Sequence, residues 1–237
     1  MCNLFTLAQP VDSITETFED IEVPDLPTPA RYSIRPGEPV ATILHDGRPK
    51  LTFTQWGLVP SWAKDPSIGQ RLTNARGETV KEKPSFKAAF HHHRCLILAD
   101  GFYEFHPVHG QPWRQPVYFR MQSQQPFAFA GLWEHWQSDN GSELITSTII
   151  TTASNQLVQP VHHRMPVILP RSAYALWLDP AVNRPEELEP FLTPFASDVM
   201  ESFDVSPRID RSSIDDRSCI APIPSSKSHQ LGLFGED

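Results

Sequence analysis

The run Cys95-Leu-Ile-Leu-Ala-Asp-Gly-Phe-Tyr-Glu-Phe105 decides the fold class, because apolar and aromatic side chains at this density favour a buried strand. Six further runs, working outward from it, are β-branched or alternate in polarity: residues 40–44, 51–58, 117–121, 127–133, 144–152 and 166–169. Turn-forming pairs such as Asp46-Gly47 and His109-Gly110 punctuate the chain between runs. The sequence therefore predicts a mainly β core.

Helices are expected to be few and short. Val11, Ile14 and Phe18 fall on one helical face of residues 11–20, and Asp12 or Ser13 is placed to cap the start. Other short helices are expected at about 78–91, 171–178 and 186–195. Proline contributes 24 of 237 residues, about twice the average usage of roughly 5%. Since proline neither continues a helix nor donates to a strand ladder, a loop-rich fold is predicted.

Length and charge limit the classes of protein to consider. A chain of 237 residues with 39% hydrophobic content can bury one sizeable core. The formal charge of −8 argues against a protein that coats nucleic acid by bulk electrostatics, because phosphate contacts need Lys or Arg. We expect one domain over residues 1–205 and a polar, flexible tail over residues 206–237.

Cysteine usage and hydropathy indicate the compartment. Three cysteines, Cys2, Cys95 and Cys219, are odd in number and widely spaced, so a disulfide framework is not expected. The start of the chain lacks the pattern of a secretory signal, and no stretch approaches the ~20 apolar residues of a membrane span. A cytoplasmic monomer without membrane association is predicted. His91-His92-His93 near Cys95 is interpreted as a solvated helix end rather than a metal site, and no cofactor is expected.

Cys2 carries the most distinctive chemistry in the chain. Once Met1 is removed, Cys2 presents a thiol and a free α-amine on adjacent carbons. The amine can attack an aldehyde to give a Schiff base, and the thiol can then close a five-membered thiazolidine. An internal cysteine cannot do this, although an early cysteine can also be accidental.

Three other segments hold candidate site residues. Asn74, Arg76 and Glu78 occupy alternate positions, so in an extended segment their side chains share one side. They can be functional groups, or they can hydrogen-bond the backbone groups of a loop. Glu104 lies among aromatic neighbours, where desolvation raises a carboxyl pKa and suits it to acid–base work; an outward-facing edge-strand Glu is equally compatible. His162 and His163 precede an apolar strand and can relay protons or serve as structural hydrogen bonders.

Taken together, the motifs resemble the SRAP family, named for SOS response-associated peptidase and understood as abasic-site processing proteins. The resemblance covers about residues 2–205, with motifs in family order: Met1-Cys2, Arg35-Pro36-Gly37, Trp56-Gly57 with Pro60-Ser61-Trp62, Asn74-Ala75-Arg76-Gly77-Glu78-Thr79, Asp100-Gly101-Phe102-Tyr103-Glu104 and His162-His163-Arg164-Met165-Pro166. It implies a single compact α+β domain with a twisted, barrel-like, mainly antiparallel β core and short flanking helices.

The resemblance also implies a function: an abasic-site sensor in single-stranded DNA that crosslinks covalently through Cys2 and shields the lesion during replication and SOS repair. Autoproteolytic removal of Met1 and AP-lyase or crosslink-reversal activity are implied with it. Cys2 would be the nucleophile, Asn74 would hold the N-terminal residue and sugar, Glu104 would transfer protons, and His162 would assist sugar ring opening. Contacts to DNA are implied for Arg35, Pro36, Trp62, Arg76 and Arg164, with Pro36 and Trp62 near a kink.

Two departures bear on these roles. The family usually continues Cys-Gly-Arg, whereas this chain reads Cys2-Asn3-Leu4, so a basic residue is missing unless Arg31 or Arg35 compensates. Met165 stands where a second arginine is common.

The end of the chain suggests a partner. Gln230-Leu231-Gly232-Leu233-Phe234 is similar to the pentapeptide by which bacterial proteins dock on the replicative sliding clamp. Gln230 would fill a polar subsite while Leu231, Leu233 and Phe234 supply apolar contacts. A location at the nucleoid and replication fork would follow.

Two rival functions use the same residues. A cysteine peptidase or N-terminal nucleophile hydrolase using Cys2 and His162 would turn over peptide or amide substrates. A non-covalent reader of modified single-stranded DNA would use Trp62 stacking and Arg76. Replacement of Cys2 by Ala separates them, because a pure reader keeps its DNA binding.

Overall fold

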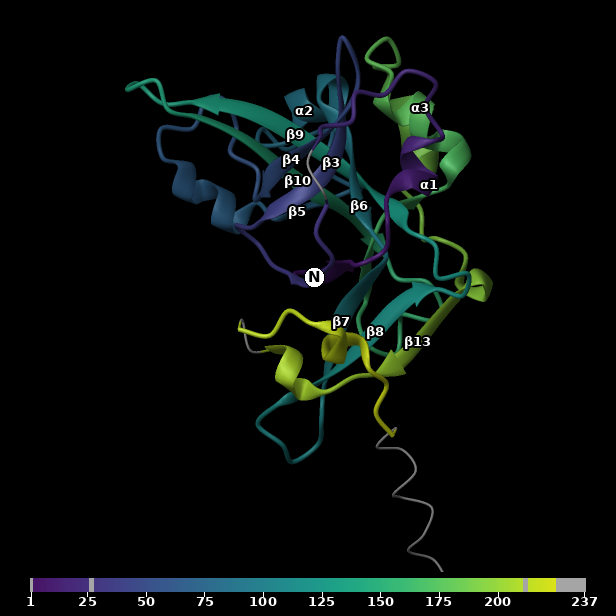
Figure 1. Ribbon diagram of the computed structural model, residues 1–237. Coiled ribbons are helices and arrows are strands. Elements are labelled where there is room, and N and C mark those ends of the chain that lie inside the picture. Colours follow the sequence, from purple (N-terminus) through teal and green to yellow (C-terminus); the bar gives the residue numbers. More distant parts are fainter. Residues whose placement is uncertain (1, 26–27, 211–212, 225–237) are drawn as a thin grey trace, which may run out of the picture.

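Two sheets form the β core of the protein in a computed structural model, which describes residues 2–25, 28–210 and 213–224 (Figure 1). The smaller sheet has the order β13-β8-β7-β1-β2, from Met200–Asp204, Arg114–Met121, Gly101–Pro107, Phe5–Leu7 and Arg31–Ile34. The larger follows β11-β10-β4-β3-β6-β9-β12, with bounds Arg164–Pro166, Glu143–Ala153, Arg48–Trp56, Pro39–Asp46, Arg94–Ala99, Phe127–Gln137 and Ile168–Leu169. β5 (Asn74–Arg76) adds a short strand beside β10.

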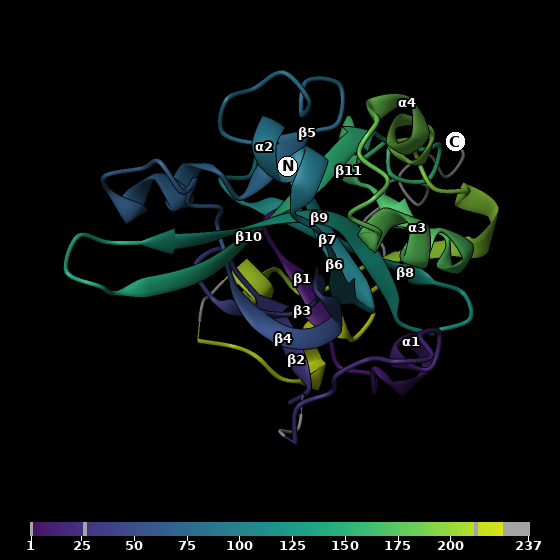
Figure 2. The ribbon, with the colours of Figure 1, turned by 90° about the horizontal axis from the view of Figure 1, so that it is seen from above.

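Most strand pairs are antiparallel; among the strands of the described residues, β10 pairs in parallel with β4 and β5. β10 also pairs with β9 to form a long hairpin that extends beyond the body (Figure 2). The prediction of a single α+β domain with a barrel-like, mainly antiparallel core is confirmed.

The run at residues 95–105 is one apolar stretch in the sequence but two strands in the structure. It breaks at Asp100, so that β6 joins the larger sheet and β7 the smaller one. The Asp100 carboxylate accepts hydrogen bonds from the backbone N–H groups of Ala8 and Gln9, at 2.7 and 2.8 Å. Any side chain at Gly101 would collide with the Tyr118 hydroxyl, because a Cβ there would lie 2.1 Å from it. This junction fixes the N-terminal strand to the start of β7.

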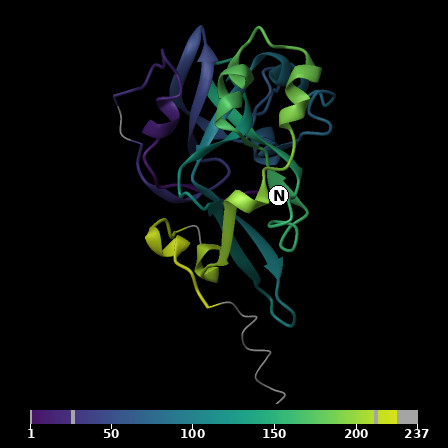
Figure 3. The ribbon, with the colours of Figure 1, turned by 90° about the vertical axis from the view of Figure 1, so that its right-hand side faces the viewer.

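Helices are short and lie around the sheets (Figures 2 and 3). They are α1 (Asp12–Thr15), α2 (Lys87–His92), α3 (Tyr174–Leu178) and α4 (Pro185–Leu188). The helix expected over residues 11–20 was too long: it ends at Thr15, and its N-cap is Val11, with no side-chain cap. Ile14 is nevertheless fully buried, and Phe18 packs against the core from the following turn. None of the helices in the described ranges is long and apolar enough to cross a membrane.

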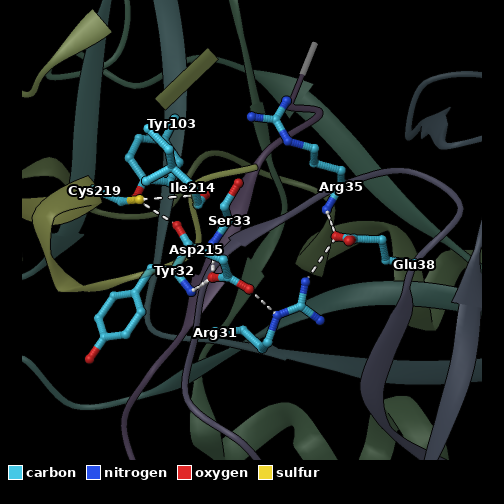
Figure 4. Close-up of polar contacts among 9 residues, drawn as sticks. All are labelled: Arg31, Tyr32, Ser33, Arg35, Glu38, Tyr103, Ile214, Asp215 and Cys219. Carbon is cyan, nitrogen blue, oxygen red and sulfur yellow. Dashed lines mark hydrogen bonds and ion pairs between the residues drawn. The ribbon is translucent and has the colours of Figure 1, made fainter. Parts of the chain in front are cut away.

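The chain after β13 stays against the smaller sheet (Figure 3). Val205, Ile209 and Cys219 are buried in a small cluster with Leu4, Tyr103 and Tyr118. The Asp215 carboxylate accepts the backbone N–H of Ser33 at 2.9 Å, also accepts that of Tyr32, and pairs with Arg31 (Figure 4). The described structure thus continues past residue 205, where the sequence analysis places the domain boundary, and covers the open edge of β2.

Candidate active site

Cys2 lies just before β1, which is inserted between β7 and β2 in the smaller sheet. β1 pairs antiparallel with β7, with Phe5 opposite Phe102, and the Leu4 carbonyl accepts the Tyr103 N–H at 3.0 Å. This register, continued toward the N-terminus, puts Asn3 opposite Glu104. Cys2 is 1% exposed, so the nucleophile predicted from the sequence sits inside the protein beside the predicted acid–base residue.

The Cys2 thiol is held in its protonated form. Burial, together with the nearby negative charge of Glu104, raises the pKa of the thiol well above its usual range. Its Sγ lies 3.8 Å from the Leu4 carbonyl oxygen. The thiol therefore needs a base to become a nucleophile.

Asn74 fixes the backbone of the N-terminal residue. Its Nδ2 donates to the Cys2 carbonyl oxygen at 2.9 Å and lies 3.0 Å from the Asn3 side-chain oxygen. The pairing of β5 with β10, with Asn74 opposite Ile149, sets the direction of this side chain. Its Oδ1 is buried and has no hydrogen-bond partner among the described residues, so an acceptor remains available next to Cys2.

Glu104 and His162 form the acid–base pair of the site. The Glu104 Oε1 and the His162 Nδ1 are 4.0 Å apart, and both side chains are largely buried. Desolvation raises the pKa of Glu104 to about 7, and desolvation lowers the pKa of His162. Burial thus favours the neutral form of both groups, so the protonated carboxyl group is populated near neutral pH and the charged imidazole is disfavoured.

The His162 ring has a defined orientation. Its Nδ1 lies 3.0 Å from the backbone nitrogen and 3.1 Å from the carbonyl oxygen of Arg164, and the ring stacks on His163 with 4.5 Å between centroids. The Arg164 backbone offers Nδ1 both a donor and an acceptor, so it can hold either tautomer of the neutral ring. A neutral imidazole held in this way can relay a proton.

A cleft of about 420 Å³ opens beside these groups. Its lining residues come from the N-terminus, the β2–β3 turn, β7, the β7–β8 loop, the start of β8, the His162 loop and the C-terminal segment: Asn3, Leu4, Arg35, Tyr103, Glu104, Phe105, Pro112, Trp113, Arg114, His162 and Asp210. It is wide enough for a sugar-sized substrate to approach Glu104 and His162.

Arg31 and Arg35, the two arginines that could compensate for the basic residue missing at Leu4, differ in their contacts. Arg31 is committed to the carboxylates of Glu38 and Asp215 (Figure 4). Arg35 lines the cleft, its guanidinium donates only to the Ile209 carbonyl, and its Nε has no partner among the described residues. Leu4 itself is buried, so Arg35 is the cation closest in role to the missing basic residue.

The other predicted DNA contacts lie outside the cleft lining. Pro36 and Arg76 are exposed, and Trp62 is 60% exposed. The Arg164 guanidinium binds both carboxylate oxygens of Glu78 and the Thr151 carbonyl. Gln230, Leu231, Leu233 and Phe234 lie outside the described residues.

Sequence reasoning missed Trp113, Arg114 and Asp210 as cleft residues. Trp113 was the available signal, because a tryptophan in a polar turn between two strands has no evident core to join. Two of the three histidines before Cys95 have separate partners: His91 contacts the Asn183 carbonyl and His93 contacts Glu134, while His92 is exposed. In the described ranges no group of three His, Cys, Asp or Glu side chains is arranged to hold a metal.

The fold and this site define a class: single-domain α+β proteins that place the second residue, a cysteine, in a buried site beside a Glu–His pair. The sequence profile of the SOS response associated peptidase (SRAP) family matches residues 1–212, and the chain belongs to that family.

Relatives and solved structures agree with this assignment. The chain is 41% identical over 208 residues to the abasic site processing protein YoqW of Bacillus subtilis, covering 87% of this chain and 92% of that one. It is 33% identical to the abasic site processing protein HMCES of Rattus norvegicus, over 75% of this chain and 58% of the relative. A crystal structure of a Bacteroides thetaiotaomicron protein shares the fold with a TM-score of 0.83 at 23% identity, covering 94% of this chain and all of that one. Membership of this family supports a role in abasic-site processing.

Proposed function

We propose that this protein captures abasic sites in single-stranded DNA as a covalent crosslink to Cys2, after removal of Met1. The observation that carries the proposal is the placement of a buried Cys2, held through its carbonyl by Asn74 at 2.9 Å, beside the Glu104–His162 pair. An abasic nucleotide has lost its base, so its C1′ can open to an aldehyde. An N-terminal cysteine is matched to that group by its adjacent amine and thiol.

The chemistry balances as a condensation. The ring-opened sugar gives the C1′ aldehyde, and the neutral α-amine of Cys2 adds to C1′ to form a carbinolamine. Loss of the hydroxyl as water gives a protonated Schiff base, and the thiol sulfur then adds to the same carbon. The thiol proton and the iminium charge cancel when a base carries the proton away. One aldehyde, one amine and one thiol thus give one thiazolidine and one water.

Glu104 and His162 supply the proton transfers. Ring opening moves a proton from the C1′ hydroxyl to the departing ring oxygen, and the His162 imidazole can relay it. Loss of water needs an acid, and activation of the thiol needs a base. A carboxyl with a pKa of about 7 is populated in both forms near neutrality, so Glu104 can serve in both steps.

The same groups account for the other activities in the proposal. Addition of the Glu104 proton to the thiazolidine sulfur breaks the C–S bond and restores the Schiff base, and addition of water to C1′ then releases the free amine and the aldehyde, which completes crosslink reversal. A Schiff base that lingers before sulfur addition allows strand cleavage by a lyase route. Removal of Met1 requires hydrolysis of the Met1–Cys2 peptide bond, and Glu104 is our candidate for the carboxyl that assists it. Closure of the thiazolidine shields the strand during replication, because it removes the Schiff base.

The proposal is tested by incubating the protein with single-stranded DNA that carries one abasic site and separating the products on a denaturing gel. A heat-stable band that is lost in Cys2→Ala and kept in Cys219→Ala, a matched change of another buried cysteine, supports covalent capture. If wild type forms no covalent product and Cys2→Ala still binds the DNA, the result favours the non-covalent reader of modified single-stranded DNA. Hydrolysis of added peptides, lost in Cys2→Ala, favours the peptidase.

A further inference from the structure

A feature of the cleft that the proposed function leaves unused is the turn at the end of the β7–β8 hairpin. In Figure 1 this hairpin extends below the body of the molecule, away from the larger sheet. Pro112, Trp113 and Arg114 line the same cleft as Glu104 and His162. A strand that places its abasic sugar at Glu104 therefore carries its neighbouring nucleotide along this wall.

Trp113 is exposed without an evident structural reason. It is 40% exposed, and its Nε1 donates to the Gln111 side-chain oxygen of the same turn at 3.2 Å, the one polar contact of its side chain among the described residues. Large aromatic side chains in a cleft beside nucleic acid commonly serve as stacking platforms for bases. A base next to an abasic site has lost its neighbour on one side, so an indole ring can replace that partner.

Arg114 is a cation without a carboxylate partner in the described ranges. Its guanidinium donates to the Phe105 carbonyl and lies 5.8 Å from the centroid of the Phe105 ring. These contacts fix the group at the cleft wall while leaving its charge uncompensated. Arginine in this setting is suited to a phosphate.

We propose that Trp113 and Arg114 form a subsite for the nucleotide adjoining the abasic sugar, with its base stacked on Trp113 and its phosphate bound by Arg114. This inference rests on the proposed function, since it assumes single-stranded DNA in the cleft. The subsite would make the protein sensitive to whether a base is present beside the lesion.

The subsite also connects DNA binding to the acid–base pair. Burial has the larger effect on both groups: it raises the pKa of Glu104 and lowers that of His162. The positive charge of Arg114 lowers both pKa values, so it opposes burial at Glu104 and adds to it at His162. A phosphate on Arg114 offsets that charge, so the pKa of Glu104 rises when the nucleotide is in place. Glu104 then holds its proton at the stage where water must leave the carbinolamine.

The test combines a protein change with a DNA change. Trp113→Ala and Trp113→Phe are compared with wild type on oligonucleotides with normal flanks, and on ones whose 5′ or 3′ neighbour is a stable tetrahydrofuran residue without a base. Binding is measured by fluorescence anisotropy in the Cys2→Ala background with a tetrahydrofuran residue at the lesion. Covalent capture of a true abasic site is measured separately in the Cys2 protein.

We expect Trp113→Ala to weaken binding about tenfold, the scale of one base stacked on an aromatic side chain. Removal of the base on one flank of the DNA should weaken binding by wild type by the same factor and should not weaken binding by Trp113→Ala any further. Trp113→Phe should bind nearly as tightly as wild type. Phe53→Ala, a change of a partly exposed aromatic outside the cleft, should bind as wild type. Unchanged binding by Trp113→Ala, or losses that multiply, would overturn the base subsite.

The phosphate contact is tested by salt. Arg114→Gln should reduce the slope of log affinity against log salt by about 0.7, the value for one phosphate of a single strand. An unchanged slope would overturn the phosphate contact. Failure of wild type to crosslink refutes the proposed function alone, because the anisotropy measurement does not require Cys2.

Discussion

Replacement of Glu104 by Gln should make the protein more stable at alkaline pH while it impairs capture of DNA. Glu104 is 3% exposed, and burial raises the pKa of its carboxyl group from 4.5 to about 7. Between these values the unfolded chain has released its proton and the folded protein has kept it. The contribution of Glu104 to stability is therefore complete below pH 4.5 and is lost as the pH rises through about 7.

The magnitude follows from the shift. At 1.36 kcal/mol per pKa unit, ionised Glu104 costs the folded state about 3 kcal/mol at pH 8 relative to pH 4.5. For a domain of this size that corresponds to roughly 10 °C in Tm. Gln has nearly the same shape and no proton to lose, so it removes the cost.

The assay is urea unfolding of wild type and Glu104→Gln at a series of pH values from 4.5 to 8.5. The quantity of interest is the difference in unfolding free energy between the two proteins at each pH, because groups common to both cancel. This difference should move by about 3 kcal/mol in favour of Glu104→Gln as the pH rises. Parallel profiles would refute the conclusion that burial controls the protonation of Glu104.

Three further changes follow from the same contacts. Asn74→Ala releases the Cys2 carbonyl and should slow crosslinking about tenfold, measured by quenched time courses; an unchanged rate would remove Asn74 from the site. Asp215→Ala uncovers two backbone N–H groups of β2 and should lower the unfolding free energy by about 1–2 kcal/mol in urea, with Asp210→Ala as a control that leaves these bonds intact. Deletion of residues 230–234 should abolish pull-down by the sliding clamp and spare crosslinking; retained pull-down would contradict the clamp-docking prediction.

The fold class could be predicted from the sequence because strands leave short runs of apolar or alternating side chains in it. Each of the apolar runs became strand, and the fold resembled that of the SRAP family as expected. The division of residues 95–105 between two sheets was not evident, because it depends on Asp100 binding backbone N–H groups 91 and 92 positions away. β1, β2 and β13 were missed as well, because strands of three to five residues give too few positions for a pattern.

Part of the candidate active site could be predicted from the sequence. Cys2, Asn74, Glu104 and His162 could be chosen from motifs. In the structure Glu104 and His162 line the cleft, while Cys2 is buried and its carbonyl is bound by Asn74. The lowered pKa of His162 could not be derived, since it depends on how deeply the ring is buried. The replacement of a basic residue by Leu4 also had no sequence explanation. In the structure Leu4 packs with Val205, Ile209 and Cys219, so the C-terminal segment accounts for an apolar side chain at that position.

The most direct test of covalent capture is intact mass spectrometry of the protein after reaction with a short single-stranded oligonucleotide containing one abasic site. We predict a product whose mass equals the protein without Met1 plus the DNA minus one water. Its N-terminal peptide should resist both borohydride reduction and thiol alkylation, as a thiazolidine does. An adduct that survives only after borohydride trapping, or that maps to a lysine with Cys2 still open to alkylation, would contradict the account.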